Sequence, residues 1–500
     1  MNRAGKLFLT VIAALMFFSA GFKAEASGPF KNELLGLDGV VSVDEIVQSG
    51  DVFSEKYIAW FEQPIDWDSP DIGTFLQRVE IGFSGWASVN VVQVNGYGLR
   101  PSRFPLDDRS AIAKMYNANY VNIEYRYFSK SIPDGLSEDS TALWQYLNNK
   151  NASNDFHKIL SQLKRILSGT WAFTGGSKGG QAVNVFSYYY PNDADVYVSY
   201  VAPFCIGTED MRVMDAIYTS IGNERYGEAQ AQGYRDMMLK FQVEAIRNRD
   251  YLQPRLSDFN YFNDNSLRPF RTPEHQFEWN VVDFVGLVWL YDHEFASVDA
   301  VLKMPHETSE DKKIYLDAMV SLMEPSKGSY SLFPYVYQAY TENGAYGFNL
   351  SYLREAVERE GLSLVTTEEE EVSFEAKMNF TDEQLRVFKY DQSLRDEMLN
   401  WTHTTKSNVI MIYGNSDPWY FARLPDVDDN PNVHIFTTSM SHAANIAGMP
   451  SEQQAEITEL LDRWLLLGGW YHKSGSASGC NAGVPVMMIM PLMLFFLKRR

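Results

Sequence analysis

The sequence predicts an α/β fold, in which a mostly parallel sheet carries helices on both faces and is interrupted by a helical insertion. Strand-like and helix-like patterns alternate in the first part of the chain, give way to a long helical stretch, and return near its end. Such alternation is typical of a parallel sheet, because each crossover helix returns the chain to the same side of the sheet and all strand ends meet at one edge.

The first part of the chain supplies four predicted strands with helices between them. Short apolar runs rich in β-branched residues predict the strands, and apolar positions at helical spacing predict the helices. A turn at 95–98 follows the first of these strands. In chain order we predict a strand at 91–94, a helix at 107–116, a strand at 120–127, a helix at 137–167, a strand at 170–174, a helix at 181–190 and a strand at 196–202.

A helical, aromatic-rich insertion follows and defines the predicted domain organisation. We expect an α/β domain made of residues 27–205 and 405–472, and a helical cap domain made of residues 206–404 over the edge at which the strands end. The clearest later elements are helices at 277–289 and 310–323, strands at 408–413 and 433–436, and a closing helix at 452–467.

Both ends of the chain predict export. Residues 1–26 have the order of features of a signal peptide, with two early cations, an apolar stretch and the small-residue site Ala24-Glu25-Ala26. Residues 473–500 comprise a linker, the motif Gly479-Cys480-Asn481-Ala482-Gly483, an apolar run and a basic end. This tail resembles the bacterial Synerg-type C-terminal sorting domain. The resemblance implies transient membrane contact, processing near Cys480, and a location in the cell envelope or outside the cell.

Composition argues against several function classes. The formal net charge of −21 would repel a phosphate backbone, so nucleic acid is not an expected partner. The two cysteines, Cys205 and Cys480, lie in the body and in the tail, so we predict no structural disulfide and a buried, apolar role for Cys205. No Cys-x-x-Cys pair or His-Glu-x-x-His cluster is present, so we predict neither a metal nor a cofactor. The sequence leaves the oligomeric state open.

Ser177 is the predicted nucleophile. It stands in Gly175-Gly176-Ser177-Lys178-Gly179, which fits G-x-S-x-G and lies between a predicted strand and a predicted helix. Such a turn exposes the serine above the sheet edge, the glycines avoid clashes, and the helix N-terminus favours a developing negative charge. The alternatives are a simple glycine-rich turn and a phosphate-binding loop, although the Lys-Ser/Thr ending of the latter is missing.

His442 is the predicted base and Asp417 the predicted acid that orients it. His442 follows the last predicted strand, and Asp417 follows the strand before it in Tyr413-Gly414-Asn415-Ser416-Asp417-Pro418-Trp419. The order serine, acid, histidine is that of the α/β-hydrolase fold, which is therefore the predicted fold class. The simpler interpretations are a loop histidine and a turn aspartate. The alternatives for the acid are Asp426, Asp428 and Asp429.

An acyl-transfer site also needs hydrogen-bond donors for an oxyanion. In this fold one donor is the backbone N–H after the nucleophile, here that of Lys178, and the other comes from the loop after an earlier strand. Residues 95–98 form that loop, and we favour the N–H of Tyr97. A tight turn without this role is the alternative.

Four motifs extend the pattern beyond these residues. They are Glu124-Tyr125-Arg126-Tyr127-Phe128, the segment 174–180, Tyr335-Val336-Tyr337-Gln338-Ala339-Tyr340-Thr341-Glu342 and the segment 413–419. They resemble motifs of the secreted tripeptidyl aminopeptidase family of serine peptidases, which includes prolyl tri/tetrapeptidyl aminopeptidases. The resemblance runs from about residue 91 to the closing helix. It departs at Gln181-Ala182, where the family usually has a Met-Thr-like pair, so it says little about fine specificity.

The resemblance implies that the substrates are peptides and that short peptides are released from free N-termini, often after proline or a small residue. A cap over the site would admit thin, unfolded chain ends, and a free amine needs a carboxylate to hold it. Glu342 and Glu278 lie in the aromatic cap segments and are the predicted carboxylates. A surface carboxylate or an internal ion pair is the alternative for each.

Other function classes remain open at this point. A serine esterase or lipase, or a hydrolase like the related Pro-Xaa carboxypeptidases, would use the same three residues. The many Tyr and Glu residues of the insertion favour peptide ends over lipid. A non-catalytic binding protein on the same scaffold is expected to lack one of the three residues, and none is missing.

Overall fold

The computed structural model describes residues 29–46, 52–86, 89–99, 110–138, 140–256, 272–291, 294–323 and 333–467. The predicted signal peptide and the predicted sorting tail lie outside these residues and stay predictions. Within the described ranges, no helix has both the length and the apolar character needed to cross a membrane.

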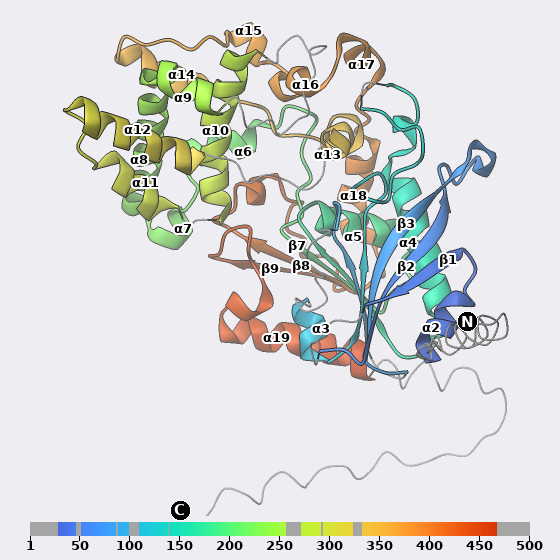
Figure 1. Cartoon of the computed structure of the whole chain (residues 1–500). Coiled ribbons are helices and arrows are strands. Elements are labelled where there is room, and N and C mark those ends of the chain that lie inside the picture. The colour runs from blue at the N-terminus through green and yellow to red at the C-terminus, as the bar shows by residue number, and fades with distance from the viewer. Residues whose placement is uncertain are drawn as a thin grey trace, which may run out of the picture.

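A nine-stranded sheet forms the body of the molecule (Figure 1). The strand order is β1-β2-β3-β5-β4-β6-β7-β8-β9, and the six strands from β5 to β9 are parallel to one another. The strands β1, β2 and β3 add an antiparallel extension that pairs with β5. The strands are β1 (Val40–Glu45), β2 (Glu55–Pro64), β3 (Thr74–Phe83), β4 (Asn90–Val94), β5 (Asn119–Ile123), β6 (Trp171–Gly176), β7 (Val196–Tyr200), β8 (Val409–Gly414) and β9 (Val433–Thr438).

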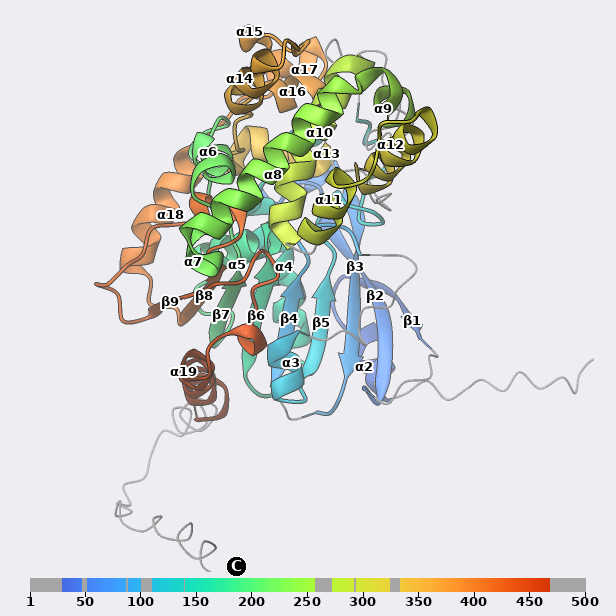
Figure 2. The same cartoon turned by 90° about the vertical axis from the view of Figure 1, so that its left-hand side faces the viewer.

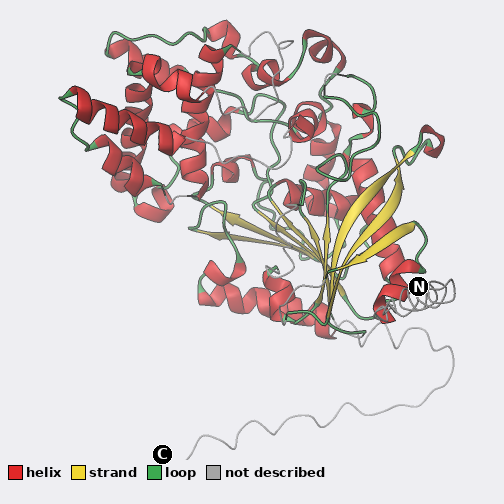
Figure 3. Ribbon diagram, viewed as in Figure 1, coloured by secondary structure: helices red, strands yellow, loops and turns green. Residues whose placement is uncertain are grey.

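Helices cover both faces of this sheet, which lies between them as one layer (Figure 3). One face packs against α2 (Pro29–Leu35), α4 (Asn149–Leu163), α5 (Lys178–Tyr189) and α18 (Ser393–Thr404). The other face packs against α3 (Ala111–Met115) and α19 (Ser451–Asp462). Burial on both faces explains why a central strand such as β8 is apolar and buried at every position.

The helical insertion between β7 and β8 forms the cap, which lies beyond one end of the parallel strands in both views (Figures 1 and 2). Much of it surrounds a second apolar core of its own. Its helices are α6 (Met211–Thr219), α7 (Asn223–Tyr226), α8 (Glu228–Arg247), α9 (Arg249–Leu256), α10 (Pro273–Tyr291), α11 (Phe295–Leu302), α12 (Ser309–Met323), α13 (Phe333–Gln338), α14 (Ser351–Arg359), α15 (Glu368–Glu371), α16 (Phe374–Asn379) and α17 (Asp382–Val387).

The predicted fold class is confirmed, and two predicted elements were too long. The helix predicted at 137–167 begins only at Asn149, because the side chain of Asn148 caps it by accepting the Asn151 N–H at 2.8 Å. The strand predicted at 120–127 ends at Ile123, and the backbone soon turns into the left-handed region, at Tyr127 (φ 70°).

The sequence analysis missed β1, β2 and β3. Charged residues obscure their strand pattern, and some of these charges are buried. Arg78 and Glu80, both on β3, are almost completely buried and form an ion pair at 2.6 Å. In a sequence, charged residues such as these predict exposed positions, because their burial as an ion pair becomes visible only in the structure.

Candidate active site

Ser177 lies on a strained turn between β6 and α5. Its backbone has φ 55° and ψ −126°, a conformation that L-residues rarely adopt, and its N–H donates to the carbonyl of Tyr200 on β7 at 2.9 Å. Glycine is required nearby, because a Cβ at Gly175 would overlap the carbonyl of Gly179, and a Cβ at Gly179 would overlap that of Val94. The turn therefore presents Ser177 at the carboxyl end of the sheet.

Asp417 and His442 form a hydrogen-bonded pair beside this turn. His442 Nδ1 lies 2.7 Å from Asp417 Oδ2, and Asp417 Oδ1 accepts the N–H of Trp419 at 3.0 Å. Asp417 is completely buried, whereas the His442 side chain keeps 11% of its surface exposed. With Nδ1–H donated to Asp417, the Nε2 atom of His442 is left to act on a neighbouring group.

The alternative acids lie elsewhere. Asp426 is exposed and pairs with Arg423 at 3.1 Å, and Asp429 is exposed and bonds to His403 at 2.7 Å. Asp428 is exposed as well. Of the four carboxylates, Asp417 is the one that contacts His442 in the structure.

Ser177 and His442 line one cavity of about 460 Å³ between the body and the cap. The body also contributes Tyr97 and Lys178, and most of the other lining side chains are aromatic or apolar. The cap is tied to this site directly, because the backbone N–H of His442 donates to the carbonyl of Leu290 on α10 at 3.0 Å.

The loop after β4 packs against the start of α5. Gly96 has φ 78°, and a Cβ there would overlap the backbone N of Gly179, so the two backbones are in direct contact. Tyr97 and Lys178 consequently flank Ser177 at the same cavity. This is the arrangement that two backbone donors to an oxyanion require.

The motif at 124–128 supports this loop. Glu124 is buried and accepts the N–H of Leu99, just past the loop, at 2.7 Å, and the N–H of Lys130 at 2.9 Å. Burial raises the pKa of Glu124, and these hydrogen bonds oppose the rise. Glu124 therefore stabilises the loop that carries Tyr97.

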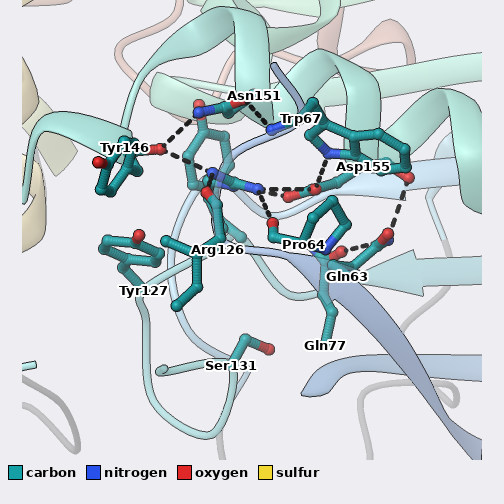
Figure 4. Close-up of polar contacts among 12 residues, drawn as sticks. Gln63, Pro64, Trp67, Gln77, Arg126, Tyr127, Ser131, Tyr146, Asn151 and Asp155 are labelled. Carbon is teal, nitrogen blue, oxygen red and sulfur yellow. Dashed lines mark hydrogen bonds and ion pairs between the residues drawn. The ribbon is translucent and has the colours of Figure 1, made fainter. Parts of the chain in front are cut away.

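Arg126 of the same motif forms a buried anchor (Figure 4). Its Nε and Nη2 donate to Asp155 on α4 at 2.7 and 2.9 Å, and Trp67 donates to the same carboxylate at 2.8 Å. Its Nη1 donates to the carbonyls of Ile65 and Tyr146 at 3.0 and 2.6 Å. Both charges are fully buried, so removing one partner would cost about 3–5 kcal/mol. The arginine joins the end of β2, the segment after β5, and α4.

Glu342, a predicted amine-binding carboxylate, is hydrogen-bonded to the body of the molecule. Its Oε2 accepts the N–H of Asn149, the first residue of α4, at 2.8 Å. Burial raises its pKa to about 7, against the opposing effects of Asn149 and the nearby Lys178. Among described residues its neighbours Asn343 and Gly344 line the cavity, but Glu342 does not. Its position fits an internal carboxylate at a helix N-terminus, and its predicted role in amine binding stays a prediction.

Lys178 is buried close to Glu342. Its Nζ lies 3.2 Å from the centre of the Tyr125 ring and 5.3 Å from that of Phe128. Burial lowers the pKa of this lysine well below its usual range, and the charge of Glu342 opposes that shift. The side chain therefore packs among aromatic rings, while its backbone belongs to the turn around Ser177.

Glu278, the second predicted amine-binding carboxylate, also has internal partners. It is buried, forms an ion pair with Arg249, and accepts the backbone N–H groups of Val365 and Thr366 at 2.6 and 2.9 Å. These bonds join α10 to the segment before α15, so the prediction for Glu278 is corrected to a structural ion pair.

Asp283 is the residue that the sequence analysis missed. It lies on α10, lines the cavity that contains Ser177 and His442, and interrupts the apolar run Val281-Val282-Asp283-Phe284-Val285. Burial raises its pKa to about 7. A lone charge in an apolar helical run is a signal that could have pointed to it.

The fold and the site define the class of protein. A mostly parallel sheet with a serine at a strand-to-helix turn, followed in the chain by an aspartate–histidine pair at later strand ends, is the architecture of a serine hydrolase of the α/β-hydrolase fold. The chain belongs to the PS-10 peptidase S37 family, whose family model matches residues 24–472. The family resemblance seen in the sequence motifs is thereby confirmed.

Individual proteins are similar over most of the chain. A prolyl tri/tetrapeptidyl aminopeptidase from Streptomyces mobaraensis is 24% identical over 438 residues, which are 87% of this chain and 84% of that protein. Two of the similar solved structures are a proline iminopeptidase from Mycobacterium smegmatis (14% identity, 82% of this chain and 99% of that one, TM-score 0.32) and an α/β fold family hydrolase from Bacillus anthracis (11%, 81% and 99%, TM-score 0.33).

Proposed function

We propose that this serine peptidase is an exopeptidase that releases tripeptides from free N-termini through an acyl-enzyme on Ser177. The observation that supports it most is that Ser177 and His442 line one cavity between the body and the cap, with His442 hydrogen-bonded to the buried Asp417. The three side chains follow three different strands of the parallel sheet, so the sheet itself holds them at one edge.

In the proposed mechanism His442 Nε2 takes the proton of Ser177 Oγ as that oxygen attacks the substrate carbonyl. Asp417 holds the ring in the required tautomer and stabilises the imidazolium that forms. The backbone N–H groups of Lys178 and Tyr97 bind the oxyanion. The proton then passes to the leaving amine, and a water activated by His442 hydrolyses the ester on Ser177.

The cavity also favours a peptide end as substrate. It lies between body and cap, and aromatic rings such as Trp279, Tyr335 and Trp419 line it beside the site. Flat apolar walls of this kind suit proline and small apolar side chains. The similarity to a protein from Streptomyces mobaraensis that is named a prolyl tri/tetrapeptidyl aminopeptidase agrees with cleavage at this distance from the N-terminus.

Product analysis tests this proposal. The wild-type enzyme is incubated with an eight-residue peptide that has proline at position three, in a free and in an N-acetylated form, and the products are identified by mass spectrometry. We expect one N-terminal tripeptide from the free peptide and little cleavage of the acetylated one. Equal cleavage of both forms would favour an endopeptidase, and cleavage of simple esters alone would favour an esterase.

Export is a separate part of the proposal and depends on residues 1–26 and 473–500. Protein recovered from the cell envelope should begin near Ser27 and lack most of the tail after Cys480. Intact-mass analysis checks this, and an envelope-bound chain that still ends at Arg500 would contradict a processed sorting signal.

A further inference from the structure

One face of α10 forms a wall of the cavity. Trp279, Asp283, Leu287 and Leu290 line it, at spacings of three or four residues that place them on the same side of a helix. Among the described lining residues, Asp283 is the only carboxylate. The rest of this wall is apolar, so Asp283 is its single point of negative charge.

Asp283 has no internal partner in the part of the chain that the structure describes. No hydrogen bond or ion pair joins its carboxyl group to another described residue, and burial alone accounts for the rise of its pKa to about 7. It also borders a second, smaller cavity of about 120 Å³, lined mainly by apolar side chains such as Val213, Ile217 and Phe348. A carboxylate without a partner in such surroundings is costly, and a cationic ligand would remove that cost.

The two predicted amine-binding carboxylates differ from Asp283 in this respect. Glu278 is occupied by Arg249 and two backbone N–H groups, and Glu342 by the N-terminus of α4. A substrate ammonium would have to displace these partners. At Asp283 it would displace no described hydrogen-bond or ion-pair partner.

The position of Asp283 along α10 matches the length of a tripeptide. It precedes Leu290 by seven residues, a rise of roughly 10 Å along an α-helix. The Leu290 carbonyl in turn accepts the backbone N–H of His442, so the far end of this span is fixed beside the proposed base. Three extended residues also reach roughly 10 Å. An ammonium held at Asp283 would thus leave the third residue of the substrate near Ser177.

We infer that Asp283 binds the N-terminal ammonium of the peptide substrate and thereby sets cleavage after the third residue. This inference rests on the proposed exopeptidase function and assigns its specificity-determining group. Asp283 acts in binding only, because it would hold the amine at the far end of the tripeptide from the bond that breaks. The ammonium keeps its charge throughout.

The test compares two substrates that differ only in the amine. Alanyl-alanyl-prolyl-p-nitroanilide carries it, and propionyl-alanyl-prolyl-p-nitroanilide has hydrogen in its place, with no added bulk. For the wild-type enzyme we expect kcat/KM to be higher on the free amine by roughly tenfold to several hundredfold. For Asp283→Asn we expect that ratio to fall close to one, through loss on the free amine with an unchanged rate on the propionyl substrate.

The matched control is Asp236→Asn, which changes an exposed cap carboxylate on α8 outside the cavity and should keep the wild-type ratio. A preserved ratio in Asp283→Asn would overturn the assignment of Asp283 and leave the exopeptidase proposal standing. Equal rates on both substrates in the wild type would overturn both.

A second measurement needs no variant. The benefit of the amine is measured in the wild type for di-, tri- and tetrapeptidyl p-nitroanilides, each with its desamino counterpart. The spacing along α10 predicts the largest benefit for the tripeptide. A maximum at the dipeptide would overturn Asp283 as the anchor, because its carboxylate would then lie too far from the cleaved bond.

Discussion

The sheet edge and the cap wall, which is the face of α10 that lines the cavity, differ in the hydrogen bonding of their carboxylates. At the sheet edge, Asp417 is completely buried and hydrogen-bonded to both His442 and the N–H of Trp419. On the cap wall, Asp283 faces the cavity without a described partner. The difference matches the two proposed roles. Asp417, with both hydrogen bonds made, holds His442 in position for the chemistry, whereas Asp283 is left to bind the amine of the substrate.

The largest effects should come from the sheet edge. Ser177→Ala and His442→Ala should each lower kcat by about a millionfold, because the first removes the nucleophile and the second removes the base that takes its proton. Asp417→Asn should cost about 10⁴-fold, since it leaves the ring in the wrong tautomer. The measurement is kcat on a tripeptidyl p-nitroanilide, with circular dichroism to establish that each variant folds.

Asp426→Asn is the control for the acid, since Asp426 is exposed and pairs with Arg423. It should retain wild-type kcat. If Asp426→Asn proved as damaging as Asp417→Asn, the assignment of the acid would be wrong.

The next effect tests the backbone contact that builds the sheet edge. Gly179→Ala should lower the free energy of unfolding by about 1–3 kcal/mol and also reduce kcat, because the new Cβ would push against the Val94 carbonyl and the loop that carries Tyr97. Urea unfolding and kcat measure the two effects.

Gly233→Ala is the matched control, because nothing lies near the position of its Cβ on α8. It should raise the free energy of unfolding by about 0.5–1 kcal/mol and leave kcat unchanged. An equally harmless Gly179→Ala would mean that β4 and α5 are not in the tight contact described here.

Asp283 on the cap wall should make the preference for a free amine depend on pH. Only ionised Asp283 can bind an ammonium, and its pKa is raised to about 7, so the kcat/KM ratio of the amine and desamino substrates should rise with pH up to about 7. It should fall again above about 8, where the substrate amine loses its proton.

Other titratable groups of the cavity act on both substrates alike and cancel in this ratio. They are Lys178, Cys205, His442, Tyr97, Tyr291, Tyr335 and Tyr346. In Asp283→Asn the acidic limb should disappear. A wild-type ratio that stays flat from pH 5 to pH 7 would argue against ionisation of Asp283 as its cause.

A further effect concerns Glu342, the carboxylate that is hydrogen-bonded to the start of α4. Burial raises the pKa of Glu342 from 4.5 to about 7, so its contribution to stability is present below pH 4.5 and is lost as the pH rises through 7. The loss should amount to about 1–3 kcal/mol. Glu342→Gln cannot ionise, so its Tm should fall less than that of the wild type between pH 5 and pH 8.

The same variant separates structure from recognition. Glu342→Gln should keep the wild-type preference for a free amine, because Glu342 does not line the cavity. If Tm fell equally with pH in the wild type and in Glu342→Gln, the raised pKa of Glu342 would be contradicted. If Glu342→Gln lost the preference for a free amine, Glu342 would belong to the substrate site.

The difference between the two walls also explains what the sequence could predict. Each residue of the sheet edge lies within four residues of the end of its own strand, so G-x-S-x-G and the order Ser177, Asp417, His442 carry the information locally. On α10, Glu278 and Asp283 are five residues apart and point about 140° away from each other. Whether the face with Glu278 or the face with Asp283 lines the cavity depends on the packing of the whole cap. A local sequence pattern therefore does not predict it.

Covalent trapping is the most direct test of Ser177 as the nucleophile of this peptidase. The wild-type enzyme is treated with a phosphorylating reagent such as diisopropyl fluorophosphate, and intact mass, the modified peptide and residual activity are followed together. We expect one added group, located on Ser177, formed in step with the loss of peptide hydrolysis and absent in Ser177→Ala. Full peptidase activity with a modified Ser177, or inactivation through another residue, would contradict it.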